Sequence, residues 1–184
     1  MTCIIGLIAD DTIYLGTDSA VSADQRIHTL LDKKIFKKGP YGVGFAGSLR
    51  VGQIIKYRMR TPTLKKNSAK NPTKILVINF VDAMRKALKD AGASREVDGR
   101  EEEQDSDFII AFQNRLFVID SGYSVCEAKD KYIAIGSGAD YALGSLYSTN
   151  GGIFSPEERI QLALEVSAHF CTDVAGPFEI IKIK

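Results

Sequence analysis

The second residue of the chain, Thr2, carries a hydroxyl and, once Met1 is removed, a free α-amine on the same residue. Such an amine can take the hydroxyl proton while the oxygen attacks a carbonyl carbon, so nucleophile and base share one residue. The ordinary pKa of an α-amine, near ~8, makes it an effective base close to neutral pH. Many chains begin with Met-Thr, however, so the prediction of a catalytic threonine depends on the residues that Thr2 meets.

A carboxylate, Asp18, is predicted to lie near Thr2 across a β-hairpin. Residues 3–9 and 13–17 are strand-like, and Asp10-Asp11 marks the turn between them. A two-residue loop places Asp18 opposite Cys3. A three-residue loop places it directly opposite Thr2, with the Cβ atoms about 5 Å apart. The sequence does not choose between these registers, and a slip of one residue reverses the face.

Two adjacent lysines, Lys33 and Lys34, open the next predicted strand pair. In a strand, one of two adjacent side chains faces each side, so one lysine can point at Asp18 while the other reaches water. An inward ammonium would keep Asp18 ionised and lower the pKa of the Thr2 amine, which leaves more neutral base at pH 7. On spacing alone, two surface lysines near a strand end are the simpler interpretation.

Two glycine-containing junctions precede predicted helices, and the first offers a candidate oxyanion donor. Residues 44–48 close a strand and open a helix, where backbone N–H groups are unsatisfied. Gly47 has no side chain to block a substrate carbonyl, and its N–H could donate to an oxyanion, a contribution of roughly 3 kcal/mol. A plain tight turn is the alternative. Ser137, between Gly136 and Gly138, lies before a predicted helix and is a candidate helix cap.

The elements that must position these residues alternate between groups of strands and pairs of helices. Strands are predicted over residues 3–9, 13–17, 34–36, 42–46, 108–112, 116–119, 123–126, 132–135 and 178–183. Helices are predicted over residues 48–57, from about residue 74 to a stop at Gly92, after Gly138, and from a capping box at Ser155. Residues 61–73 are predicted to be a polar loop, and the acidic segment 95–107 is predicted to be a solvated loop to which we assign no function. This order favours an α+β fold of two stacked sheets between two helical layers, a four-layer αββα sandwich.

The composition is that of an ordinary globular chain. Its 184 residues suit one domain spanning residues 1–184, with 45% hydrophobic residues, 26% charged residues and a net charge of +1. The near-neutral balance gives no reason to expect nucleic acid as a partner. No apolar stretch reaches the ~18 residues of a membrane span, and no signal peptide is recognisable, so we expect a cytoplasmic protein with no membrane partner.

The cysteines and histidines give no metal-binding pattern. Cys3, Cys126 and Cys171 are scattered without a CxxC pair, and His28 and His169 lie near no cysteine pair in the sequence. A zinc site is therefore not expected, and reduced thiols in a cytosolic compartment are the simplest interpretation. We predict neither a metal nor a cofactor.

Five short motifs occur in one order with matched gaps along nearly the whole chain. They are Thr2-Cys3-Ile4-Ile5-Gly6, Gly16-Thr17-Asp18-Ser19, Lys33-Lys34-Ile35-Phe36, Gly42-Val43-Gly44-Phe45-Ala46-Gly47-Ser48 and Ala134-Ile135-Gly136-Ser137-Gly138. In this pattern the chain resembles the proteasome β-subunit superfamily of N-terminal nucleophile (Ntn) hydrolases, in particular the bacterial HslV-type peptidase and its short bacterial or phage homologues.

The resemblance implies a threonine-type endopeptidase and a role for each matched residue. Thr2 is similar to the catalytic threonine and Asp18 to its acidic partner, and Lys34, rather than Lys33, matches the family lysine by its distance from the threonine. The Gly47 amide matches the oxyanion position. Ser137 matches the serine that hydrogen-bonds near the threonine amine, a role compatible with helix capping.

The chain also departs from the family pattern in several places. Asp173 is followed by Val174 where the proteasome has a supporting Asp and Ser three residues apart, and Val174 stands where HslV-type chains have a threonine near a cation site around Cys171. Cys3 replaces a common second threonine, and we interpret it as a strand residue. The start at Met1-Thr2 agrees with HslV-type chains, in which removal of the methionine suffices.

The resemblance further implies polypeptide substrates and homo-oligomeric assembly into a ring or stacked rings that enclose the sites. An ATP-driven unfoldase of the AAA+ type is a candidate partner. Two other functions remain open at this point. One is a non-proteolytic amidohydrolase that acts on small amides through the same threonine, and the other is a catalytically inactive ring-forming structural protein.

Overall fold

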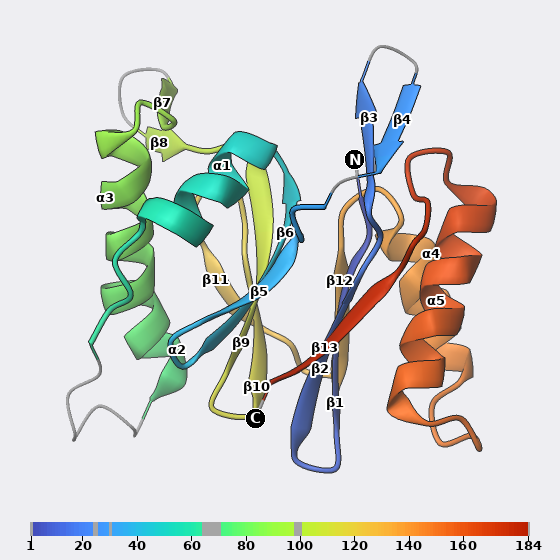
Figure 1. Cartoon of the computed structure of the whole chain (residues 1–184). Coiled ribbons are helices and arrows are strands. Elements are labelled where there is room, and N and C mark those ends of the chain that lie inside the picture. Colours follow the sequence, from blue (N-terminus) through green and yellow to red (C-terminus); the bar gives the residue numbers. More distant parts are fainter. Residues whose placement is uncertain (1, 24–25, 30, 64–70, 98–100, 184) are drawn as a thin grey trace.

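Two β-sheets packed face to face form the centre of the molecule in the computed structural model, which describes residues 2–23, 26–29, 31–63, 71–97 and 101–183. One helical layer covers the outer face of each sheet, so the layers run helix, sheet, sheet, helix (Figure 1). This order confirms the predicted αββα sandwich. Met1 and residues 64–70 of the predicted loop lie outside the described residues.

The first sheet has the N-terminal hairpin at its middle. Its antiparallel strands follow the order β12 (Tyr132–Ile135), β1 (Ile4–Ala9), β2 (Thr12–Thr17) and β13 (Glu179–Ile183). Ala9 pairs with Thr12, and Asp10 and Asp11 have φ values of 48° and 54°, as a two-residue type I′ turn requires. The hairpin therefore has the first of the two registers, in which Asp18 falls opposite Cys3.

The second sheet is also antiparallel and carries the strand that ends at Gly47. Its order is β11 (Val125–Glu127), β10 (Arg115–Ile119), β9 (Ser106–Phe112), β6 (Tyr41–Gly47) and β5 (Ile35–Lys38). Two separate hairpins, β3 (Ala20–Ala23) with β4 (Arg26–Thr29) and β7 (Arg95–Val97) with β8 (Glu101–Glu103), lie at the upper end of the molecule in Figure 1.

The helices flank the sheets in two groups. The second sheet is covered by α1 (Leu49–Gln53) with the π-helical turn η1 (Ile54–Arg58), and by α2 (Pro72–Ile75), η3 (Leu76–Val81) and α3 (Asp82–Asp90). The first sheet is covered by α4 (Ala139–Ser148) and α5 (Pro156–Phe170), and the predicted capping box at Ser155 and Glu158 is present. Among the described residues, no helix has the length and apolar character that crossing a membrane would need.

The core consists of three apolar layers, one under each helical layer and one between the sheets. The layer between the sheets contains Ile4 and Leu15 from the first sheet and Ile35, Ile109 and Leu116 from the second. Because β1 is covered by a helical layer on one face and by the other sheet on the other, its first four residues are all buried. This explains why its sequence is continuously apolar rather than alternating.

Some local predictions were wrong. The segment 95–107, predicted to be a loop, contains β7, β8 and the start of β9, and the hairpin β3–β4 was not predicted. The turn between β9 and β10 is centred on Gln113 and Asn114, which both have positive φ, one residue earlier than expected. β7 and β8 pair through backbone groups over only three residues each, and such short pairings leave no alternation in the sequence.

Candidate active site

Thr2 lies at one end of the interface between the sheets, in contact with two charged groups. Its side-chain hydroxyl donates a hydrogen bond to Asp18 Oδ1 and accepts one from Lys34 Nζ. Lys34 Nζ lies 2.9 Å from the same Asp18 oxygen. The three residues are buried, with 2%, 0% and 3% of Thr2, Asp18 and Lys34 exposed. The structure thus brings a hydroxyl, a carboxylate and an ammonium into mutual contact without water between them.

Asp18 reaches Thr2 although the hairpin register places it opposite Cys3. β2 ends at Thr17, so the side chain of Asp18 need not follow the alternating side-chain directions of the strand. Its carboxylate accepts hydrogen bonds from the backbone N–H of Cys3 and of Ala20, both at 3.0 Å. These bonds fix the position of the carboxylate just beyond the end of β2, where it contacts Thr2.

Lys34 is the lysine that points inward, and Lys33 points outward. Besides Thr2 and Asp18, the Lys34 ammonium donates to the carbonyl oxygen of Ala20 (2.6 Å). Burial lowers the pKa of the Lys34 ammonium below its ordinary value, and the Asp18 carboxylate opposes this shift. Lys33 is 54% exposed and pairs with Glu179 at 3.2 Å.

The loop before α4 holds the backbone of Thr2. The Thr2 nitrogen donates to Ser137 Oγ at 3.3 Å, and the Gly138 N–H donates to the Thr2 carbonyl oxygen at 3.3 Å. Gly136 has a φ of +92°, and a Cβ built there would lie 2.3 Å from that carbonyl oxygen. Only glycine permits this approach, so the Gly-Ser-Gly segment is shaped to fit the N-terminal residue.

Gly47, at the end of β6, lines two hollows that Thr2 also lines. One, of about 370 Å³, is bordered by Val21, Lys34, Phe45, Ser48, Leu49 and Arg50, and the other, of about 330 Å³, by Ala46, Asp105, Ser106, Asp107, Ser121, Gly136 and Ser137. The φ of Gly47 is +122°, and a Cβ there would lie 2.3 Å from the Asp105 carbonyl oxygen. The glycine is therefore required by the backbone as well as by access to Thr2.

The second hollow contains residues that the sequence interpretation missed. Asp105, Ser106 and Asp107 belong to the segment that was given no function, yet they line this hollow together with Thr2. Burial, with a smaller contribution from the Asp120 carboxylate, raises the pKa of Asp107 above its ordinary value. The sequence carries no local signal for this placement, because it results from the pairing of Gly47 with Ser106 between β6 and β9.

The remaining predicted features near the site are structural. Burial raises the pKa of the Cys3 thiol to about 12, so Cys3 stays protonated at neutral pH and does not compete with Thr2 as a nucleophile. All three cysteines are free thiols. Val174 is buried against Cys3 and α5 in the layer under the first sheet. Within the described residues, no group of three or more His, Cys, Asp or Glu side chains could hold a metal ion.

Comparisons with known structures agree with this architecture. Thiobacillus denitrificans BPH, solved in complex with epoxomicin, superposes with a TM-score of 0.80 at 20% identity, over 99% of this chain and 98% of that one. Eukaryotic HslV from Trypanosoma brucei gives 0.68 at 17% identity, over 98% of each chain. A Gly-1 mutant of Anbu from Hyphomicrobium sp. strain MC1 gives 0.69 at 18% identity, over 98% of this chain and 80% of that one.

The sequence matches no protein-family model and no curated protein. At identities near 20%, the structural similarity defines the fold, which is the HslV- and proteasome-like Ntn-hydrolase fold. This confirms the resemblance drawn from the five motifs.

Proposed function

We propose that the chain is a threonine-type endopeptidase whose nucleophile is Thr2 after removal of Met1. The observation that supports this proposal most strongly is the contact of the Thr2 hydroxyl with both the Lys34 ammonium and the Asp18 carboxylate. A buried ion pair is expensive to desolvate and is a weak source of stability. Its placement on a hydroxyl at the junction of two hollows favours a chemical role.

In the first half-reaction, Thr2 Oγ1 attacks the carbonyl carbon of a peptide bond. The hydroxyl proton passes to the Thr2 α-amine, directly or through a water, and the carbonyl becomes a tetrahedral oxyanion. The Gly47 N–H stabilises this oxyanion. Collapse of the intermediate breaks the C–N bond, the protonated amine gives its proton to the leaving amine, and an acyl ester of Thr2 remains.

In the second half-reaction, water attacks the ester carbonyl while the α-amine of Thr2 accepts its proton. The ester C–O bond breaks, the protonated amine gives its proton to Thr2 Oγ1, and the carboxylic acid product leaves. Lys34 donates to Thr2 Oγ1 and so stabilises the negative charge that develops on this oxygen. Its positive charge also lowers the pKa of the amine, Asp18 keeps the lysine in place, and Ser137 orients the amine.

The substrates in this proposal are polypeptides, which occupy the hollows on either side of Thr2. We further propose that the active form is a homo-oligomeric ring or stacked rings in the cytoplasm, with an AAA+ unfoldase as a candidate partner. The support is the similarity of the fold to HslV and to the proteasome-like BPH.

The first test joins the mass of the mature N-terminus with reactivity toward epoxomicin, the compound bound in the BPH structure. We expect purified protein to lack Met1 and to gain one epoxomicin mass per chain, located on the N-terminal peptide. The Thr2→Ala variant, which we expect to keep the fold, should gain no mass. A protein that retains Met1 and does not react would contradict the proposal.

A second test separates peptide hydrolysis from hydrolysis of small amides. Casein and extended fluorogenic peptides should be cleaved in a Thr2-dependent manner, and small amides should not be preferred. A clear preference for small amides would instead indicate a non-proteolytic amidohydrolase.

A further inference from the structure

We propose that Asp32 and Lys56 form a positioning pair that holds the segment leading to Lys34, and thereby keeps the Lys34 ammonium on Thr2. This inference rests on the proposed function for its kinetic consequences. Lys56 belongs to the π-helical turn η1 on the outer layer, so the pair would couple that turn to the candidate active site. Single π-helical turns inside helices are frequent at functional sites.

The position of Lys34 is not fixed by a strand alone. β5 begins at Ile35, and Lys34 is tied to β6 by one bond, from the Phe45 N–H to the Lys34 carbonyl oxygen (3.1 Å). On the other side of Lys34, Leu31 is 99% exposed. Between these two points, the backbone of residues 32 and 33 leads into the site and depends on contacts outside the strand.

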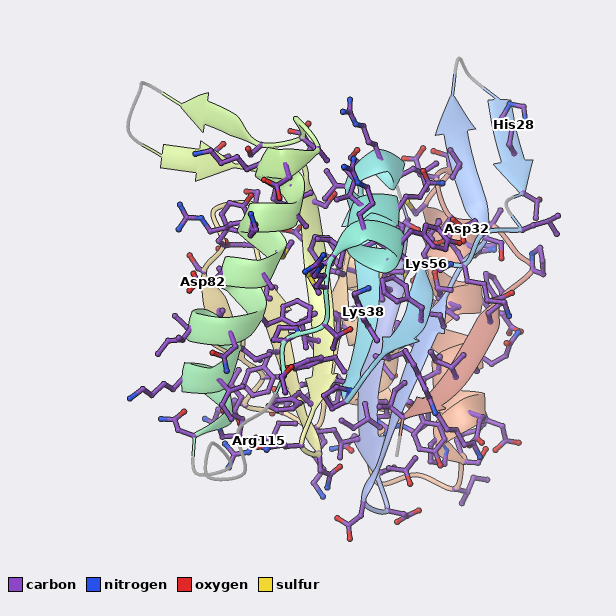
Figure 2. The ribbon with its side chains drawn as sticks, turned by 60° about the vertical axis from the view of Figure 1, so that its left-hand side comes forward. His28, Asp32, Lys38, Lys56, Asp82 and Arg115 are labelled. Atoms are coloured by element: carbon purple, nitrogen blue, oxygen red, sulfur yellow. The ribbon has the colours of Figure 1, made fainter. Side chains whose placement is uncertain are left out.

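Asp32 is held by three side chains from one face of the helix. Lys56 Nζ and Tyr57 Oη (2.8 Å) both donate to Asp32 Oδ1, and Gln53 Nε2 donates to Oδ2 at 3.4 Å. Lys56 and Tyr57 follow Gln53 by three and four residues, so each lies on the side of the helix that carries Gln53. Figure 2 shows Asp32 beside Lys56, with Lys38 close by on the other side.

Lys56 binds more than Asp32. Its ammonium also donates to the Lys33 carbonyl oxygen (3.2 Å) and lies 5.5 Å from the centroid of the Phe36 ring, while Lys38 Nζ donates to the Lys56 carbonyl oxygen (2.9 Å). One side chain therefore contacts both residues that precede Lys34 and a ring on β5. The Lys56 side chain is 18% exposed, against 54% for Lys33 in the Lys33–Glu179 pair, so the ammonium of Lys56 is the more protected from water.

Lys34 needs this support because small displacements of a catalytic group are costly. Its ammonium meets Thr2 Oγ1, Asp18 and the Ala20 carbonyl at once, and the Cys3 thiol is the further titratable group that acts on it within the described part of the chain. A shift of about 1 Å in such a group can lower a rate by up to about 100-fold. Loss of the positioning pair should let Lys34 move toward water and away from Thr2.

The test uses Asp32→Asn, Lys56→Met and the double variant in the full chain. In either single variant we expect kcat for a peptide substrate to fall roughly tenfold with KM nearly unchanged. With Lys34 displaced, the pKa of the Thr2 amine rises, so the ascending limb of the pH profile of kcat/KM should move to higher pH. If both side chains act through one contact, kcat of the double variant should fall no further than kcat of the more damaged single variant.

An NMR titration of Lys34, in protein that carries isotope-labelled lysine, provides a readout that does not depend on activity. In the variants, the pKa of Lys34 should move toward the ordinary lysine value as burial is lost. The matched control is Lys33→Met, which removes an exposed ion pair but keeps the carbonyl that Lys56 contacts, and it should leave every readout unchanged.

The outcomes separate this inference from the proposed function. If the Asp32 and Lys56 variants keep the kcat, the pH profile and the Lys34 titration of the wild type, the positioning role is overturned, even if their melting temperature falls. Wild-type protein that hydrolyses no peptide would contradict the proposed function alone, and the Lys34 titration would then decide whether the pair positions Lys34.

Discussion

The layer between the two sheets is apolar along most of its length and charged at one end. Ile4, Leu15, Ile35 and Ile109 fill the apolar part, and every one of them is almost fully buried. At the end where β1 and β5 begin, the same layer closes with Thr2, Asp18 and Lys34, which are just as buried. Ile4 follows Thr2 by two positions and Ile35 directly follows Lys34, so the two kinds of contact are adjacent in the chain.

The difference shows which part of the interface serves stability and which does not. Burying an apolar side chain contributes about 1.5–3 kcal/mol, whereas a buried ion pair often contributes less than apolar residues of the same volume. The apolar part therefore accounts for the association of the sheets. The charged end adds little to it, and its contacts with a hydroxyl are better explained by chemistry at Thr2.

The largest expected effect separates chemistry from folding at the charged end. Thr2→Ala removes the nucleophile and a side chain of modest size, so peptide hydrolysis should fall by roughly 10⁴-fold or more. The melting temperature should stay near that of the wild type. Peptide assays and thermal denaturation of the same preparations check this prediction, and loss of folding would mean that Thr2 is mainly structural.

Lys34→Ala should damage both activity and stability. It removes the cation from Thr2 and leaves the Asp18 carboxylate buried without its partner, which typically costs about 3–5 kcal/mol. Activity per folded molecule should fall nearly as far as in Thr2→Ala. Denaturant unfolding measures the loss of stability, and peptide hydrolysis measures the loss of activity. A variant as stable as the wild type would show that the Lys34–Asp18 pair is less shielded from water than the structure indicates.

A matched change in the apolar part should affect stability alone. Leu15 is fully buried between the sheets, and Leu15→Ala should lower the free energy of unfolding by about 2–5 kcal/mol. Activity per folded molecule should change only a few-fold, because Leu15 does not line either hollow beside Thr2. A loss of activity as large as that of Lys34→Ala would remove the distinction between the two parts.

The smallest effect is expected at the neighbouring lysine. Lys33→Ala removes an exposed pair with Glu179, a kind of contact that contributes about 0–1 kcal/mol. Activity should stay within about twofold of the wild type, measured in the same peptide assay. A larger loss of activity in Lys33→Ala than in Lys34→Ala would show that Lys33, not Lys34, serves the site.

Much of the fold was predictable because its signals are local. The apolar run of β1, the turn at Asp10 and Asp11 and the capping box at Ser155 each depend on a few adjacent residues. The hairpins β3–β4 and β7–β8 were not predicted, since backbone pairing over three or four residues needs no apolar pattern. Asp105 and Asp107 were missed at the site because only the pairing of β6 with β9 brings them to Thr2.

The sequence by itself determined the set of groups available for chemistry: a hydroxyl on the second residue, one carboxylate near the end of the first hairpin, two lysines and a glycine before a helix. Strand spacing left open the register of the hairpin and which lysine turns inward, and only the family resemblance favoured Lys34. The tertiary structure decided both, because the end of β2 frees Asp18 from the strand alternation and the second sheet brings Lys34 across the interface. Charges so far apart in the chain meet only when two sheets pack and exclude water between them.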